Sequence, residues 1–226
     1  MARLRPTPPA LGFQRHLHPE PGRILTDIRD AAVHYVEQGW SVQPGTYQVD
    51  GSPCWHGSAD AVGLQPIAPA WSAAGITDAA HAREVWTRRP YSILMACGPV
   101  VDALQVPAAL GALVIHDLRA ARCLPPIIAG PFDTWLLLIA PGEPMLLELV
   151  LQRGIRVHGR GQWIVLPSTA FGRRPYRWRM HPRAVNWSVP PARAVQRIVL
   201  DVVAPEFRRR RRADAQRLRR GSDDSR

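Results

Sequence analysis

Residues 154–168 read GIRVHGRGQWIVLPS, and the prediction of the fold starts from this stretch. Apolar residues alternate with polar ones on both sides of Gly159-Arg160-Gly161, and such alternation is typical of half-buried strands. The two glycines favour a tight reversal of the chain between these segments. The sequence therefore predicts a β-hairpin over residues 154–168.

Arginine is concentrated in the polar half of this hairpin and in the segment that follows it. Trp163, Tyr176 and Trp178 lie among these arginines in the sequence. Because arginine binds phosphate bidentately and aromatic rings stack on bases, the region predicts contact with a phosphate-bearing ligand or strand. The candidate phosphate-binding residues are Arg156, His158, Arg160, Arg173, Arg174 and Arg177.

Length and patterning predict one folded domain. A chain of 226 residues is long enough for one substantial core, and its 23 prolines predict many loops. Strand and helix patterns alternate, so we expect an α/β or α+β fold in which helices flank a mixed sheet. We expect a disordered leader over 1–22, the folded domain over 23–203 and an arginine-rich tail over 204–226.

The expected elements follow from periodicity and from capping residues. Thr77 is the expected N-cap of one helix, and Pro107 is expected to start another. The expected helices are 23–39, 77–86, 107–118, 143–153 and 190–203, and the expected strands are 39–44, 92–96, 98–107, 127–129, 135–140 and the two arms of the hairpin.

The net charge of +11 indicates a polyanionic partner, although exclusive use of arginine also follows from a GC-rich genome. The run Arg208–Arg212 is expected to stay solvated unless a polyanion pairs with it, and Arg208, Arg209 and Arg210 are further candidate nucleic-acid contacts.

Three widely spaced cysteines predict neither a disulfide framework nor a zinc site, and we expect a cytoplasmic protein. The apolar run 135–140 is too short for a bilayer span, so no membrane partner is expected.

The hairpin motif G-I-x-V-x-G-x-G-x-W-I-V-x-P-S and the following R-P-Y-x-W resemble the bifunctional DNA primase/polymerase N-terminal (Prim-Pol) domain of the archaeo-eukaryotic primase superfamily. The phrase A-x-x-Y-V-x-x-G-W-x-V-x-P over residues 32–44 resembles the opening helix and strand of that domain. The order Trp71, Thr77, Asp78 and Trp86 also matches, and the resemblance spans about 23–203. It implies a primase/polymerase-like fold and a role in DNA replication.

The resemblance also implies a two-metal site held by an aspartate pair, D-x-D, on one strand and by a third aspartate in the hairpin. The matching strand keeps only Asp102, because Leu104 stands two residues on, and Arg156 takes the third position. The family's S-G-G-x-H element is best matched by residues 131–135, which lack both glycines and end in Trp135. We expect a salt bridge between Asp102 and Arg156 in place of the metal site.

The expected function is therefore that of a degenerate Prim-Pol-like domain, which has lost metal-dependent nucleotidyl transfer and still binds DNA, RNA or a nucleotide. No cofactor is expected, and a separate helicase is a candidate partner. One alternative is an active primase or polymerase, in which Asp102 joins Asp117, Asp133 or Glu143 to hold Mg²⁺ or Mn²⁺. Another alternative is a non-enzymatic scaffold.

Overall fold

The computed structural model describes residues 21–49 and 52–204, with side chains described from Ile28 onward. The predicted leader over 1–22 and the predicted tail over 204–226 lie outside the described residues, except for residues 21, 22 and 204. Arg208, Arg209 and Arg210 are therefore outside the described part of the chain.

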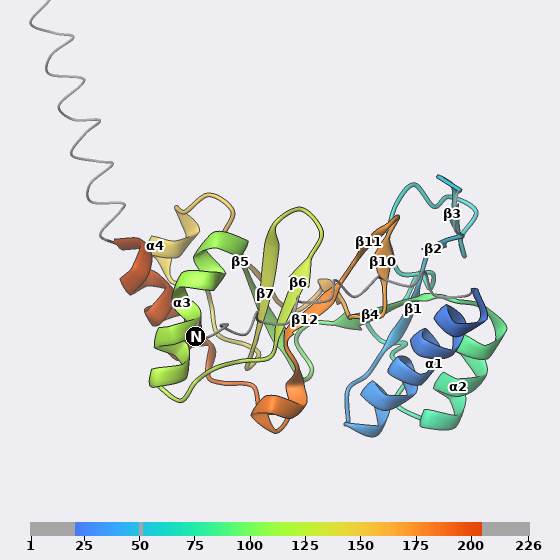
Figure 1. Cartoon of the computed structure of the whole chain (residues 1–226), viewed down its shortest axis with the longest axis horizontal. Coiled ribbons are helices and arrows are strands. Elements are labelled where there is room, and N and C mark those ends of the chain that lie inside the picture. Colours follow the sequence, from blue (N-terminus) through green and yellow to red (C-terminus); the bar gives the residue numbers. More distant parts are fainter. Residues whose placement is uncertain (1–20, 50–51, 205–226) are drawn as a thin grey trace, which may run out of the picture.

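One half of the molecule is a three-stranded sheet covered by two helices (Figure 1). The strands are β1 (Gln43–Gly45), β4 (Ser92–Ala96) and β9 (Trp163–Val165), in the order β1-β4-β9. The helices are α1 (Pro21–Glu37) and α2 (Ala79–Arg88), whose apolar faces pack in one core with these strands. This arrangement follows from the spacing of apolar residues along both helices, which places them on one side.

The other half is a five-stranded sheet in the order β12-β6-β7-β5-β8. Its outer face packs on helices, and its inner face joins the core of the first half. Its strands are β5 (Asp102–Pro107), β6 (Ile127–Gly130), β7 (Thr134–Ile139), β8 (Arg156–His158) and β12 (Arg177–Met180). The helices on the outer face are α3 (Ala108–Ala120), α4 (Leu147–Val150) and the helix over residues 192–204.

Two short hairpins and a helical turn complete the described chain. The hairpins are β2–β3 (Tyr47–Gln48 and Trp55–His56) and β10–β11 (Ala170–Phe171 and Arg174–Pro175). The turn is η1 (Pro182–Val185). In Figure 1 the β10–β11 hairpin lies between β6–β7 and β2–β3.

The expected class, helices with sheets in one domain, is confirmed. Every strand pairing among the described residues is antiparallel, so the sheets are antiparallel where a mixed sheet was expected, and the fold is the α+β form of that class. Two local predictions were wrong. The side chain of Asp78, and not that of Thr77, caps α2 by accepting the backbone N–H of His81 at 2.7 Å. The helix expected over 143–153 is reduced to the single turn of α4.

The predicted hairpin over 154–168 contains both expected strands, but these strands do not pair with each other. Strand β8 pairs with β5, with Gln105 opposite Arg156, whereas β9 pairs with β4, with Leu94 opposite Val165. The chain crosses from one sheet to the other through the turn at 159–161, where Gly161 has a φ of +83°. The stretch therefore connects the two sheets instead of forming a ribbon of its own.

Across the described residues, no helix is both long enough and apolar enough to cross a membrane.

Candidate functional site

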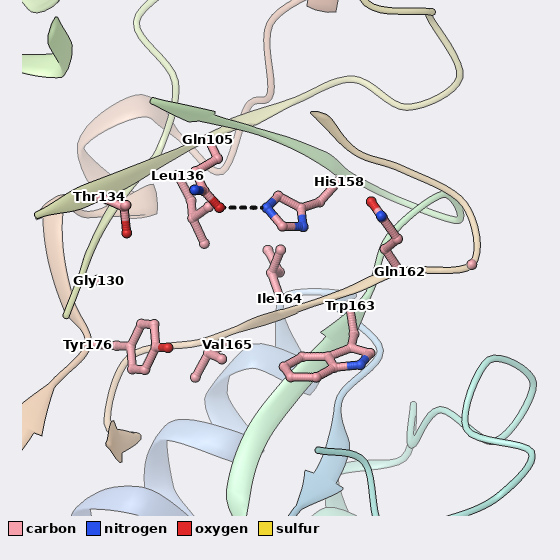
Figure 2. Close-up of a pocket in the computed structure, with 11 residues that line it drawn as sticks. Gln105, Gly130, Thr134, Leu136, His158, Gln162, Trp163, Ile164, Val165 and Tyr176 are labelled. Carbon is pink, nitrogen blue, oxygen red and sulfur yellow. Dashed lines mark hydrogen bonds between the residues drawn. The ribbon is translucent and has the colours of Figure 1, made fainter. Parts of the chain in front are cut away.

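A cavity of about 380 Å³ lies where the two sheets diverge (Figure 2). Its walls come from β5, β7, β8 and the end of β6 in the five-stranded sheet, from β9 and the turn before it, and from Tyr176 just before β12. The lining residues are Gln105, Gly130, Thr134, Leu136, His158, Gly161, Gln162, Trp163, Ile164, Val165 and Tyr176. A volume of this size suits a small organic ligand or one unit of a polymer.

The polar end of the cavity is organised by Gln105 and His158. Gln105 Oε1 and His158 Nε2 are 2.9 Å apart. Figure 2 marks this hydrogen bond with a dashed line. When Gln105 Oε1 accepts this bond, Nε2 carries the hydrogen, and Nδ1 is left as an acceptor. On the other wall, Gln162 Oε1 accepts the backbone N–H of Gly159 at 3.1 Å, which holds the turn between β8 and β9.

The cavity favours the neutral form of His158. Burial lowers the pKa of His158, and the positive charge of Arg156 lowers it further. Burial likewise raises the pKa of Tyr176, so its hydroxyl stays protonated at neutral pH. The polar groups that the cavity offers a ligand are thus amides, a hydroxyl-bearing ring, the Thr134 hydroxyl and a neutral imidazole.

Asp102 lies on the other face of β5 from this cavity. Successive residues of a strand point to opposite faces, so Gln105 shares its face with Ala103, while Asp102 shares its face with Leu104. Leu104 is buried in the core beneath α3, and Ala103 in the core between the sheets. A D-x-D pair directed at the cavity would therefore occupy positions 103 and 105, which hold alanine and glutamine, and not positions 102 and 104.

The salt bridge expected between Asp102 and Arg156 is absent among the described residues. Asp102 is 3% exposed, and its Oδ2 accepts the backbone N–H of Gly142 at 2.9 Å. Its Oδ1 is buried with no hydrogen-bond partner. Arg156 is exposed on the opposite face of the sheet, across from Gln105. The expectation was wrong because the two side chains leave different faces of neighbouring strands.

The segment matched to S-G-G-x-H forms the β6–β7 turn and the start of β7. Thr134 and Leu136 line the cavity, whereas Trp135 points to the opposite face and packs under α3. Phe132 and Asp133, in the turn, have φ values of +72° and +53°. A histidine that faces the cavity from this element would therefore occupy position 134 or 136, and not position 135.

The predicted arginines do not gather in the cavity. Arg156, Arg160, Arg173, Arg174 and Arg177 are all exposed, and none of them belongs to the cavity lining. None has an ion-pair partner among the residues that the structure describes. They come from β8, the turn after it, the β10–β11 hairpin and β12, and β8 and β12 are the two edge strands of the five-stranded sheet.

The aromatic residues expected among these arginines divide between the cavity and the core. Trp163 and Tyr176 line the cavity. Trp178 packs against Tyr35 and Trp40, and its indole N–H donates to the Tyr35 hydroxyl at 3.0 Å. Trp178 is therefore a structural residue.

The residues present do not fit the two divalent metals that the family resemblance implies. Mg²⁺ and Mn²⁺ prefer carboxylate oxygens, and none of the described residues that line the cavity carries a carboxylate. Asp117 and Asp133 are exposed on α3 and in the β6–β7 turn, while Asp102 faces the Gly142 backbone. Within the described ranges, no three His, Cys, Asp or Glu side chains converge as metal ligands.

Sequence reasoning missed three aromatic side chains at the outer edge of the site. Phe132 is 61% exposed and Phe171 is 36% exposed, and Trp55 is half-buried beside Phe171. Phe132 lies only two residues from the cavity-lining Thr134. The available signal was the Phe132-Asp133 dipeptide between two buried strands, because a turn must connect those strands and a turn exposes its side chains.

Comparison with protein families identifies the fold. A search of curated protein sequences gives no match. The family model described as "Bifunctional DNA primase/polymerase, N-terminal" matches residues 32–196, which include both sheets and the whole cavity. The chain thus belongs to the Prim-Pol family, the N-terminal domain of bifunctional DNA primase/polymerases.

Proposed function

We propose that this Prim-Pol domain binds nucleic acid or a nucleotide and no longer transfers nucleotides through divalent metals. The observation that carries the proposal is the face of β5 directed at the cavity. On this face, Ala103 and Gln105 occupy the two positions, two residues apart, that a D-x-D pair of aspartates would need. Neither side chain carries the negative charge that a pair of divalent cations requires. Arg156, across from Gln105, adds a positive charge that repels such cations.

Support for retained binding comes from the chemistry of the lining and of the outer edge. The cavity has hydrogen-bond donors and acceptors without net charge, together with the Trp163 and Tyr176 rings. Nucleobases and sugars offer matching groups and flat faces. Exposed arginines without ion-pair partners among the described residues lie outside the cavity, where phosphates of a bound strand would pass.

The test combines activity with binding on the full chain. Template-directed primer extension and primer synthesis are run with Mg²⁺ and with Mn²⁺, and the expected result is no product. Fluorescence anisotropy with single-stranded DNA and RNA is expected to give salt-dependent binding.

Metal-dependent product that is lost in Asp102→Asn would support an active enzyme with a rebuilt site. Absence of any binding would favour the scaffold. A separate helicase is not required by a domain that only binds.

A further inference from the structure

Three rings form a row on the surface beside the cavity. The Trp55 and Phe171 ring centroids are 5.3 Å apart, and those of Phe171 and Phe132 are 5.4 Å apart. The rings come from β3, β10 and the β6–β7 turn, three segments far apart in the sequence. Figure 1 places the β10–β11 hairpin between the other two segments. We call Trp55, Phe171 and Phe132 the aromatic row.

The aromatic row is held in place by specific contacts. The Gln48 side chain accepts the backbone N–H of Gly172 at 2.9 Å and donates to the carbonyl of Pro53 at 3.0 Å, so it ties the β10–β11 turn to the β2–β3 hairpin. Phe132 keeps a left-handed backbone conformation, which is unfavourable for a bulky residue. An exposed ring in such a conformation gains nothing from core packing, which favours a role at the surface.

Positive charge accompanies the row. The Arg174 guanidinium lies 5.7 Å from the centroid of the Phe132 ring, within the range of a cation–π contact. Arg173 and Arg177 are exposed on the same segment. Asp133, which follows Phe132 in the sequence, carries a negative charge, and it forms no ion pair with these arginines in the described structure. Exposed rings with unpaired guanidinium groups are complementary to unpaired bases on a phosphate backbone.

We propose that the aromatic row and Arg174 form a stacking surface for the unpaired bases of single-stranded nucleic acid. The proposal rests on the proposed function, because it assumes that the domain binds nucleic acid. It specifies which surface binds the nucleic acid, and that the bound nucleic acid is single-stranded. Since Phe132 precedes Thr134 by two residues and Tyr176 follows β11 directly, a strand lying on the row leads to the cavity. The bases stack on the rings, and their phosphates lie against the arginines.

The test measures binding of the full chain to short fluorescein-labelled oligothymidylate and oligouridylate, about 12 nucleotides long, over a range of salt concentrations. Phe132→Ala and Phe171→Ala are each expected to weaken binding at least about fivefold without changing the slope of log K against log salt. Arg174→Ala is expected to make that slope shallower by about 0.7. Preference for one of the two oligonucleotides identifies DNA or RNA as the ligand.

Two exposed positions on α3 provide matched controls. Leu113→Ala truncates a side chain that is 65% exposed, and Arg119→Ala removes an exposed charge, both on α3, which packs on the face of the five-stranded sheet that points away from the cavity. Neither is expected to weaken binding more than twofold. If the Phe132 and Phe171 variants behave like Leu113→Ala while the wild type binds, the aromatic row is excluded and the proposed function stands. If the wild type binds neither oligonucleotide, both proposals fail.

A second measurement on the unaltered chain guards against misfolding of the variants. An oligonucleotide that carries 5-iododeoxyuridine is photo-crosslinked, and the attached peptides are identified by mass spectrometry. Crosslinks at Trp55, Phe132 or Phe171 support the stacking surface. Crosslinks confined to residues 205–226 overturn it and assign binding to the arginine run.

Discussion

At the scale of single residues, Asp102 shows that a carboxylate singled out by a motif match can make a structural contact. The carboxylate is buried, faces away from the cavity and accepts the Gly142 N–H. Burial of the Cys97 thiol raises its pKa to about 12, and the negative charge of Asp102 contributes to the same shift, so this cysteine stays protonated. A residue in these surroundings stabilises the turn after β7 and contributes no ligand to the cavity.

Substitutions of Asp102 are therefore expected to change stability and not nucleic-acid binding. Asp102→Ala removes the acceptor for Gly142 and should lower the free energy of unfolding by about 1–3 kcal/mol. Asp102→Asn keeps the acceptor oxygen for Gly142 and removes the buried charge, although its NH2 group takes the place of the partnerless Oδ1, so it should destabilise the fold less than Asp102→Ala does. Urea denaturation measures both effects. A loss of oligonucleotide binding in a stable Asp102→Asn variant would contradict this assignment.

His158 predicts a dependence of stability on pH. Its pKa is lowered in the folded state, first by burial and then by Arg156, so the unfolded chain binds its proton more readily. Stability is then fully present above the unfolded pKa of about 6.5 and falls as the pH drops toward the lower, folded pKa. For one proton the slope cannot exceed about 1.4 kcal/mol per pH unit.

The measurement is urea denaturation between about pH 7.5 and pH 5, compared between the wild type and His158→Asn. The variant should lose less stability over this range than the wild type does. His116→Asn, at a histidine exposed on α3, is the control and should follow the wild type. Equal losses in all three proteins would show that His158 is not the group responsible.

At the scale of elements, periodicity predicted most helices and strands but not the pairing of the strands. Periodicity identified α1 and α3, because their apolar residues recur at helical spacing. It also identified β4, because this strand is a short uninterrupted apolar run. The pairing of β8 and β9 was missed because alternation identifies a strand without identifying its neighbour. The face of β5 was misassigned because both of its faces are buried, so hydrophobicity does not distinguish position 102 from position 103.

The contact between α3 and β7 gives a prediction at this scale. A Cβ added at Gly111 would lie 2.8 Å from Trp135 Cδ2, so the helix approaches the ring as closely as a glycine permits. Gly111→Ala gains about 1 kcal/mol of helix propensity, but overpacking against the ring costs about 1–3 kcal/mol. The expected result is a net loss of stability in thermal or urea unfolding.

A double variant separates these two effects. In a Trp135→Leu background the ring is gone, so Gly111→Ala should be neutral or stabilising there. The same loss in both backgrounds would mean that the cost does not come from the contact with Trp135. This contact also keeps β7 in the position from which Thr134 and Leu136 line the cavity.

At the scale of the whole molecule, the cavity belongs to neither sheet alone. One core lies between the sheets and the α1–α2 layer, and the other lies beneath α3 and the helix over 192–204. The composition predicted a nucleic-acid partner, but no pattern in the sequence predicts a space between two sheets, because its walls are assembled from β5, β6, β7, β8 and β9. The aromatic row was missed for the same reason, since its rings meet only after the three hairpins have folded.

The crossing of the chain at residues 159–161 has a mechanical consequence. Because β8 and β9 belong to different sheets and only a short turn links them, the angle between the sheets is set locally by that turn and by whatever fills the space beside it. A ligand in the cavity contacts both sheets, so the opening of either sheet breaks contacts with the ligand. Nucleotide binding should therefore slow amide hydrogen exchange in β4 and in β5 together, although the two strands lie in separate sheets.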